Sequence, residues 1–356
     1  MSVSSLQKAT LEKREVRKLQ VIGGSTYIIS LPKKWVTEIG LKKGSTLSII
    51  KQEDGSFLLT PEELEKPKKA AEATIEVSPE DDPQSIIRKI VSTYLVGYNV
   101  IFIRTKDQRL TSTQRNTIKN FTRRMLVGTE IIADSPTELI LKVLISYAEL
   151  SVQSALRRMC IITASMHEDA VTALKTLDKE LARDVVAMDD EVDRFGLYII
   201  RQLKAAVQNE NIIKEIGLTT GRDCLGYRLI AKAIERTADH AVEIAKNVFV
   251  LKKPLDAKIL KKIDSIGKSA ISVFNKAIES LFERDFQLAN ETVQKAKQVA
   301  LLEKEVVASV LRRASMEEIG NLRLIIESIR RTAEYASDIA EIVLNMTVEN
   351  AIKSSF

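Results

Sequence analysis

Residues 228–248, RLIAKAIERTADHAVEIAKNV, align without a gap on residues 323–343, RLIIESIRRTAEYASDIAEIV. In both segments apolar residues recur at three- and four-residue spacing, which is typical of an amphipathic helix. A segment further upstream repeats more weakly, since AMDDEVDRFGLYIIRQL resembles ALLEKEVVASVLRRASM. Each half of this region offers three helices of roughly 30 residues, or about 45 Å at the helical rise per residue. The sequence therefore predicts two similar three-helix bundles that lie side by side.

The composition is that of a folded, helix-rich protein with two or three domains. The chain has 356 residues, of which 45% are hydrophobic and 29% charged, and only 7 are proline. It shows neither an N-terminal signal segment nor a run of about 18 apolar residues, so we expect a cytoplasmic protein without membrane insertion. Cys160 and Cys224 lie in helix-like apolar segments and are predicted to be buried thiols.

The positive charge is concentrated at the start of the chain. Residues 1–51 hold ten Lys or Arg and three Glu, a local excess of +7, whereas the net charge of the whole chain is +6. Residues 1–61 alternate short strands around one helix that follows Pro32, which predicts a compact β-rich domain. So small a unit has little interior, and we expect it to dimerise. Its charge favours binding to DNA, although the lysines of GLKKGS also suit a soluble turn.

Two further segments precede the helical region. Residues 62–72 are rich in Pro, Lys and Glu and are predicted to form a linker. Residues 73–141 alternate strand and helix patterns, which predicts a small α/β domain, and from about residue 138 onward the pattern predicts only long helices. A basic helix of the α/β domain is interpreted as a solvated face rather than a phosphate site; its cations are Arg115, Lys119, Arg123 and Arg124.

Acidic residues share faces of the predicted helices. Glu235, Asp239 and Glu243 stand four apart, as do Asp189 and Asp193 in the helix before them. Like charges at this spacing repel each other, so something should offset them. Carboxylates from two neighbouring helices are suitable ligands for hard or borderline cations. The alternative is a solvated acidic face that pairs with nearby Lys and Arg side chains.

The sequence gives no support for catalysis. It contains two histidines, His167 and His240, and lacks a nucleophile elbow, an HExxH motif, paired CxxC motifs and a glycine-rich phosphate loop. A lone helical histidine is more often a hydrogen-bonded interior residue than a ligand. We therefore expect a protein that is not an enzyme.

The motifs ERTADHAVEIA (235–245) and MDDEVDRF (188–195) resemble those of the PhoU family, over residues 142–350. SLPKKWVTEIGLKKGSTLSII, within residues 15–61, resembles a SpoVT/AbrB-type domain, a swapped-hairpin DNA-binding dimer. The combination is typical of archaea. It implies a mostly α, multidomain α+β protein with an N-terminal swapped-hairpin β domain (1–61), a small α/β middle domain and a pair of PhoU-like three-helix bundles (142–252 and 253–350).

The resemblance to PhoU proteins implies multinuclear sites for iron, zinc or another divalent metal. Carried over to this chain, the ligands of the first repeat are Asp189, Asp193, Glu235 and Asp239. In the second repeat Arg330 stands where Glu235 does, and Val307 where Asp193 does. An Arg330–Glu334 pair would neutralise that face, and we expect its site to be weak or absent. The remaining candidates there are Glu303, Glu334 and Asp338.

The resemblance also implies a homodimeric regulator of phosphate uptake that binds promoter DNA through its N-terminal domain. Its expected protein partners are a phosphate transporter or components of phosphate signalling. The hairpin turn GGS lacks the arginine that AbrB-type domains often carry there. The candidate DNA contacts are Arg14, Arg17, Lys18, Lys33, Lys34, Lys42 and Lys43. One alternative is an adaptor that docks on a phosphate transporter or signalling kinase without binding DNA. Another is a metal-storage protein.

Overall fold

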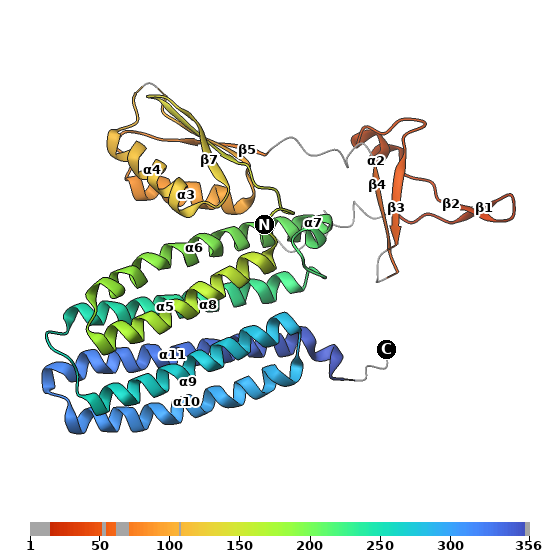
Figure 1. Ribbon diagram of the computed structural model, residues 1–356. Helices are drawn as coiled ribbons and strands as arrows, with labels where there is room; N and C mark the ends of the chain where they lie inside the picture. The colour runs from red at the N-terminus through yellow and green to blue at the C-terminus, as the bar shows by residue number, and fades with distance from the viewer. Residues whose placement is uncertain (1–14, 52–54, 62–70, 107, 353–356) are drawn as a thin grey trace, which may run out of the picture. The chain divides into compact units, whose positions relative to one another are not determined.

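The computed structural model describes residues 15–51, 55–61, 71–106 and 108–352. The chain divides into two compact units, residues 1–69 and 70–356, and each is described by itself (Figure 1). Arg14 and most of the expected linker at 62–72 lie outside the described residues.

The described residues of the N-terminal unit form two separate hairpins and a short helix. β1 (Gln20–Ile22) pairs antiparallel with β2 (Thr26–Ile28), and β3 (Leu47–Lys51) pairs antiparallel with β4 (Phe57–Pro61). α2 (Lys33–Glu38) follows Pro32, as the sequence predicts. The turn between β1 and β2 contains two glycines at positive φ, a backbone conformation that other residues rarely adopt.

The α/β domain opens the second unit. Its elements are β5 (Glu72–Glu76), α3 (Pro83–Val96), β6 (Val100–Arg104), α4 (Ser112–Met125), β7 (Thr129–Asp134) and β8 (Glu138–Val143). The strand order is β5-β6-β8-β7, in which β5 and β6 are parallel and β8 is antiparallel to both neighbours. Each helix begins at a polar cap, since the Asp82 and Thr111 side chains accept backbone N–H bonds.

The expectation of helices from about residue 138 is wrong for residues 138–143. This segment is β8, an inner strand of the sheet. Leu139 and Leu141 point into the core with no exposed surface, at the two-residue period of a strand. Because Ile140 and Val143 are also apolar, the short run does not distinguish a strand from the start of a buried helix.

The rest of the unit forms two three-helix bundles, which confirms the predicted architecture (Figure 1). The first contains α5 (Val152–Thr176), α6 (Lys179–Gln208) and α8 (Asp223–Val250), with the short α7 (Glu210–Glu215) between the last two. The second contains α9 (Ala257–Glu283), α10 (Phe286–Arg313) and α11 (Met316–Thr347), which the 3-10 turn η2 (Val348–Asn350) follows. Tight turns separate several helices, because Leu177 and Arg284 adopt left-handed conformations and Asp178 and Asp285 cap the next helix.

The two bundles share one apolar core, mainly through contacts of α8 with α11 and of α5 with α9. Gly226 permits a close approach of α8 to α11, since a Cβ there would lie 2.6 Å from the sulfur of Met346. Cys160 and Cys224 are free and buried, as predicted. The helices therefore form a rigid support for their surface residues.

The α/β domain lies against the first bundle, with α3 and α4 next to α6 (Figure 1). At one end of this contact Arg124 of α4 pairs with Asp190 of α6. At the other end Arg201 of α6 donates hydrogen bonds to the carbonyl oxygens of Tyr94 and Gly97. These contacts place the α/β domain beside the acidic segment of α6.

Candidate functional site

The four acidic residues expected in the first repeat lie on two helices that pack together. Asp189 and Asp193 are one turn apart on α6, and Glu235 and Asp239 are one turn apart on α8. Three of these side chains are partly buried, and that of Asp239 is exposed. We call this set the acidic face.

Burial and repulsion by neighbouring acids raise the pKa values of the three aspartates of the acidic face. Burial, followed by the charges of Asp239 and Glu235, raises the pKa of Asp189 to about 6. Burial, followed by the charges of the other three acids, raises the pKa of Asp193 to about 7. The pKa of Asp239 is also raised, by burial and then by Glu235. The surroundings of Asp189, Asp193 and Asp239 therefore disfavour the charged forms of these three carboxyl groups.

Nearby cations offset little of this charge. Lys232 pairs with Glu235, while Lys246 pairs with Glu243 outside the set at 2.9 Å. Within the described part of the chain, Asp193 and Asp239 have no ion-pair partner. One carboxylate oxygen of Asp189 is buried and lacks a hydrogen-bond partner. The alternative of a solvated acidic face that pairs with nearby cations is met in part, by the pairs of Lys232 with Glu235 and of Lys246 with Glu243.

The chemistry of the acidic face suits a divalent metal, because it offers several oxygen donors, one of them buried without a partner. However, in the described ranges no group of three or more His, Cys, Asp or Glu side chains is positioned to hold a metal ion. Metal binding at this face would require the carboxylate side chains to change rotamer.

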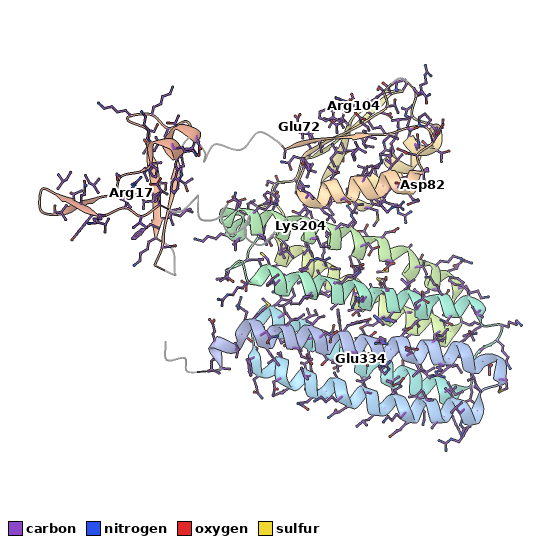
Figure 2. The ribbon with its side chains drawn as sticks, turned by 180° about the vertical axis from the view of Figure 1, so that it is seen from behind. Arg17, Glu72, Asp82, Arg104, Lys204 and Glu334 are labelled. Carbon is purple, nitrogen blue, oxygen red and sulfur yellow. The ribbon has the colours of Figure 1, made fainter. Side chains whose placement is uncertain are left out.

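The corresponding face of the second repeat is closed by ion pairs. Arg330 of α11 pairs with Glu303 of α10 at 3.2 Å and also with Glu334, the pair that the sequence predicts. Glu334 lies near the middle of α11 (Figure 2). Arg331 belongs to the same network, since it pairs with Glu327, four residues before it, and with Glu334, three residues after it. The sequence analysis missed these two pairs, although such spacings on a helix indicate pairing.

Asp338 stands apart from this network. Within the described residues it has no ion-pair partner, and burial, followed by Glu341 and Glu334, raises its pKa. The three acidic candidates of the second repeat thus do not share one site. Two of them pair with Arg330, and the third lies one turn further along α11.

Both histidines lie at the interface of the bundles. The His240 ring is 5.7 Å from the Tyr335 ring, and its Nδ1 is 3.2 Å from the Ser328 hydroxyl. His167 is buried beside the Thr237 carbonyl, and burial lowers its pKa to about 4. These contacts assign both side chains to packing between helices.

The basic candidates of the N-terminal unit are all exposed where they are described. Arg17 pairs with Glu15, and its side chain is labelled in Figure 2. Lys33 and Lys34 begin α2. Around them large apolar side chains are exposed as well, which the sequence analysis did not foresee; these include Val21, Ile22, Tyr27, Ile49 and Phe57.

Comparison with known families matches most of the helical region. The model of the PhoU domain matches residues 156–248 and 263–343, one match in each bundle. The helical half of the chain is a pair of PhoU domains. A second model, antidote-toxin recognition MazE, bacterial antitoxin, matches residues 20–67. Neither PhoU nor MazE covers the α/β domain.

Individual relatives agree with the PhoU assignment. The chain is 24% identical over 204 residues to the phosphate-specific transport system accessory protein PhoU homolog 1 of Thermotoga maritima, covering 54% of this chain and 84% of that protein. It is 22% identical over 193 residues to the PhoU homolog of Clostridium acetobutylicum, covering 53% and 87%. PhoU from Pseudomonas aeruginosa has the same helical fold, with a TM-score of 0.50 and 20% identity over 55% of this chain and 95% of that one.

Across the described residues, no helix is both long and apolar enough to cross a membrane.

Proposed function

We propose that the chain is a homodimeric, cytoplasmic regulator of phosphate uptake that binds promoter DNA through its N-terminal unit. The PhoU relatives are named as accessory proteins of phosphate-specific transport, which supports a role in the same process. The match to MazE, an antitoxin, supports a regulatory N-terminal domain. The observation that carries the proposal is the surface of this unit, which is both basic and unusually apolar.

The apolar surface favours a dimer. Among the described residues of the N-terminal unit, only Pro32 and Pro61 are buried. Tyr27 is 69% exposed, Ile49 65% and Phe57 63%. Isolated two-stranded hairpins are marginally stable in water, and a unit without a core needs a partner to bury such side chains. A second copy of the unit is the simplest partner.

The basic surface favours a polyanion. The six candidate DNA contacts that the structure describes are all exposed: Arg17, Lys18, Lys33, Lys34, Lys42 and Lys43. Two copies would present twelve, and contacts of Lys and Arg with phosphate make affinity strongly dependent on salt. A dimeric protein of this kind would grip the DNA backbone, and the operator sequence would be read by a smaller number of contacts.

The helical pair contributes the second part of the proposal. We infer that the acidic face of the first PhoU domain binds iron, zinc or another divalent metal through Asp189, Asp193, Glu235 and Asp239. A cation would offset the repulsion that raises the pKa values of Asp189 and Asp193 and would supply a partner for the buried oxygen of Asp189. The second domain has less need of a metal, since Arg330 already pairs with Glu303 and Glu334.

A gel-shift experiment on the full chain tests the DNA assignment. A double-stranded promoter fragment of a phosphate transporter operon should bind at low salt, and the affinity should fall steeply as salt rises. The double variant Lys33→Ala/Lys34→Ala should bind at least about tenfold more weakly. The matched control is Lys258→Ala/Lys261→Ala, which removes two exposed lysines of α9. Equal binding by both double variants would place the DNA site elsewhere.

The adaptor function is the second candidate. It is favoured by Leu225 and Leu229, which lie one turn apart on α8 and are 71% and 58% exposed. Such a pair suits a protein contact rather than water. Pull-down of the ATPase of a phosphate transporter by the wild type but not by Leu229→Asp, with no DNA affinity even at low salt, would establish the adaptor and reject the DNA-binding regulator.

A further inference from the structure

A cavity of about 480 Å³ lies where the α/β domain meets the first PhoU domain. Asn99 and Val143 of the α/β domain form one side, and Arg201 and Gln202 of α6 form another. The connecting segment 145–148 and the end of α7 complete the wall. Volumes of about 300–1,000 Å³ are typical of small-molecule sites. A ligand in this cavity would contact both domains at once.

Arg201 is the cation among the residues of this wall, and it is only 2% exposed. Its guanidinium donates to the carbonyl oxygens of Tyr94 and Gly97 and, at 2.6 Å, to the amide oxygen of Asn99. All three acceptors are neutral. Throughout the described ranges no carboxylate pairs with Arg201. Burial lowers its pKa, but an arginine remains charged at any physiological pH.

A buried cation without a counter-charge is costly, because neutral acceptors replace its hydration only in part. The three hydrogen bonds explain how Arg201 joins the two domains. They do not require a permanent charge, since a neutral amide would also donate to carbonyl oxygens. The Tyr94 ring, 4.7 Å from the guanidinium carbon, attracts that charge but carries no net charge to balance it. An anion in the adjacent cavity would supply the missing charge.

The rest of the cavity wall has a few polar groups held by hydrogen bonds and is otherwise apolar. The Gln202 amide donates to the Leu150 carbonyl at 2.7 Å and to the Tyr198 hydroxyl at 2.6 Å, and that hydroxyl donates to the same carbonyl. Burial raises the pKa of Tyr198 to about 12, so its hydroxyl is neutral. Val143, Ile145 and Tyr147 add apolar surface. The one carboxylate on the wall belongs to Glu215, which is exposed.

We propose that this cavity binds a small organic anion, a carboxylate or a phosphate monoester, whose head pairs with Arg201. Its apolar body lies against Val143, Ile145 and Tyr147. The cavity is much larger than an inorganic phosphate ion requires, and its apolar wall adds affinity only for a ligand with an organic body. The site is separate from the acidic face and from the N-terminal unit, so it does not rest on the function proposed above.

Calorimetric titration of the full chain tests the site with simple probes. Phenyl phosphate and benzoate represent the two head groups, benzyl alcohol is a neutral analogue, and inorganic phosphate lacks the apolar body. We expect saturable binding of phenyl phosphate or benzoate, and the stronger of the two identifies the head group. Benzyl alcohol and inorganic phosphate should each bind at least about tenfold more weakly than that probe.

The variant Ala148→Trp keeps the Arg201 hydrogen bonds and fills the cavity from its rim, since Ala148 is exposed and lines it. It should weaken binding of the preferred probe at least about tenfold. The matched control is Ala257→Trp, at an exposed position on α9. It should bind like the wild type.

Arg201→Gln is the more direct variant, but it also removes a contact between domains and is useful only where it folds. Three results would overturn the proposal. These are no saturable binding of either anionic probe, equal affinity of the wild type and Ala148→Trp, and binding of benzyl alcohol or inorganic phosphate as tight as that of the preferred probe.

Discussion

The two PhoU domains have the same internal packing but opposite surface electrostatics. Ala238, Ala241 and Ala245 of α8 are buried, and so are their counterparts in α11, which are Ala333, Ala336 and Ala340. On the neighbouring face Glu235 of the first domain is replaced by Arg330 in the second. The duplicated helix has thus kept the residues that pack it, while the charge that it presents beside its partner helix has been inverted.

This difference shows how a partly buried carboxylate set can be stabilised in two ways. In the second domain the compensating charge belongs to the protein itself, because Arg330 forms ion pairs with Glu303 and Glu334. In the first domain Lys232 pairs with Glu235 only, and the pKa values of Asp189 and Asp193 are raised. The first domain is therefore the one that gains from an added cation.

The largest change in stability is expected when Arg330 of the second domain is replaced by glutamate, the residue at the corresponding position of the first domain. Arg330→Glu removes the cation from a face where the Arg330 and Glu303 side chains are only 20% and 23% exposed. We expect the free energy of unfolding to fall by about 2–4 kcal/mol, less than for a fully buried pair because water screens this one partly. Urea unfolding in the presence of a chelator measures it.

The control for this change is Arg331→Glu, since the Arg331 side chain is 43% exposed and pairs with Glu327 and Glu334. Its cost should be about 1 kcal/mol or less. If the two variants lose equal stability, the Arg330 network is not what stabilises the second domain.

A smaller effect of opposite sign is expected in the first domain. Asp193→Asn removes a charge that burial and three neighbouring acids destabilise. The metal-free protein should become more stable at pH 8 by about 1–2 kcal/mol, a value reduced for partial exposure to solvent. The same urea titration applied to Glu334→Gln should show a loss instead, because this variant breaks ion pairs. Destabilisation by Asp193→Asn would contradict the comparison.

The smallest effect is in the pH dependence of stability. The pKa of Asp193 is about 7 in the folded chain, above its value of about 3.9 in an unfolded one. Between these values the folded state binds more protons, so this group makes stability fall as pH rises. Between pH 6 and pH 8 the metal-free protein should lose about 1 kcal/mol through this group, and Asp193→Asn should remove that part of the loss.

Asp264→Asn provides the control for the pH experiment. Lys175 and Lys268 lower the pKa of Asp264, so its contribution is present above the unfolded pKa and is lost only as pH falls through the folded one. This variant should keep the wild-type difference between pH 6 and pH 8. An Asp193→Asn variant that loses as much stability between pH 6 and pH 8 as the wild type would show that the acidic face is not strained.

The sequence predicted the parts of this architecture that depend on local periodicity. The bundles follow from apolar residues at three- and four-residue spacing, and the Arg330–Glu334 pair follows from their separation by one turn. The strand β8 was missed, because ELILKV is short and almost wholly apolar. A pattern of six such residues carries too little information about its period.

Contacts between segments that are far apart in the sequence could not be predicted from local residue patterns. Arg124 meets Asp190, and Arg201 meets Tyr94, only because the α/β domain docks on α6. The spacing of Asp189, Asp193, Glu235 and Asp239 places them on facing helices, yet it does not fix their rotamers. This is why a shared acidic face was predictable and the absence of a converged ligand set among the described residues was not.

Metal retention tests the central claim most directly. Full-length protein stripped with a chelator is reconstituted separately with Fe²⁺ and with Zn²⁺, desalted, and subjected to elemental analysis. The account predicts that the wild type and Glu334→Gln retain equal amounts of at least one metal, whereas Asp193→Asn/Asp239→Asn loses most of it. Retention of neither metal by the wild type, or a loss caused by Glu334→Gln but not by the double variant, would contradict it.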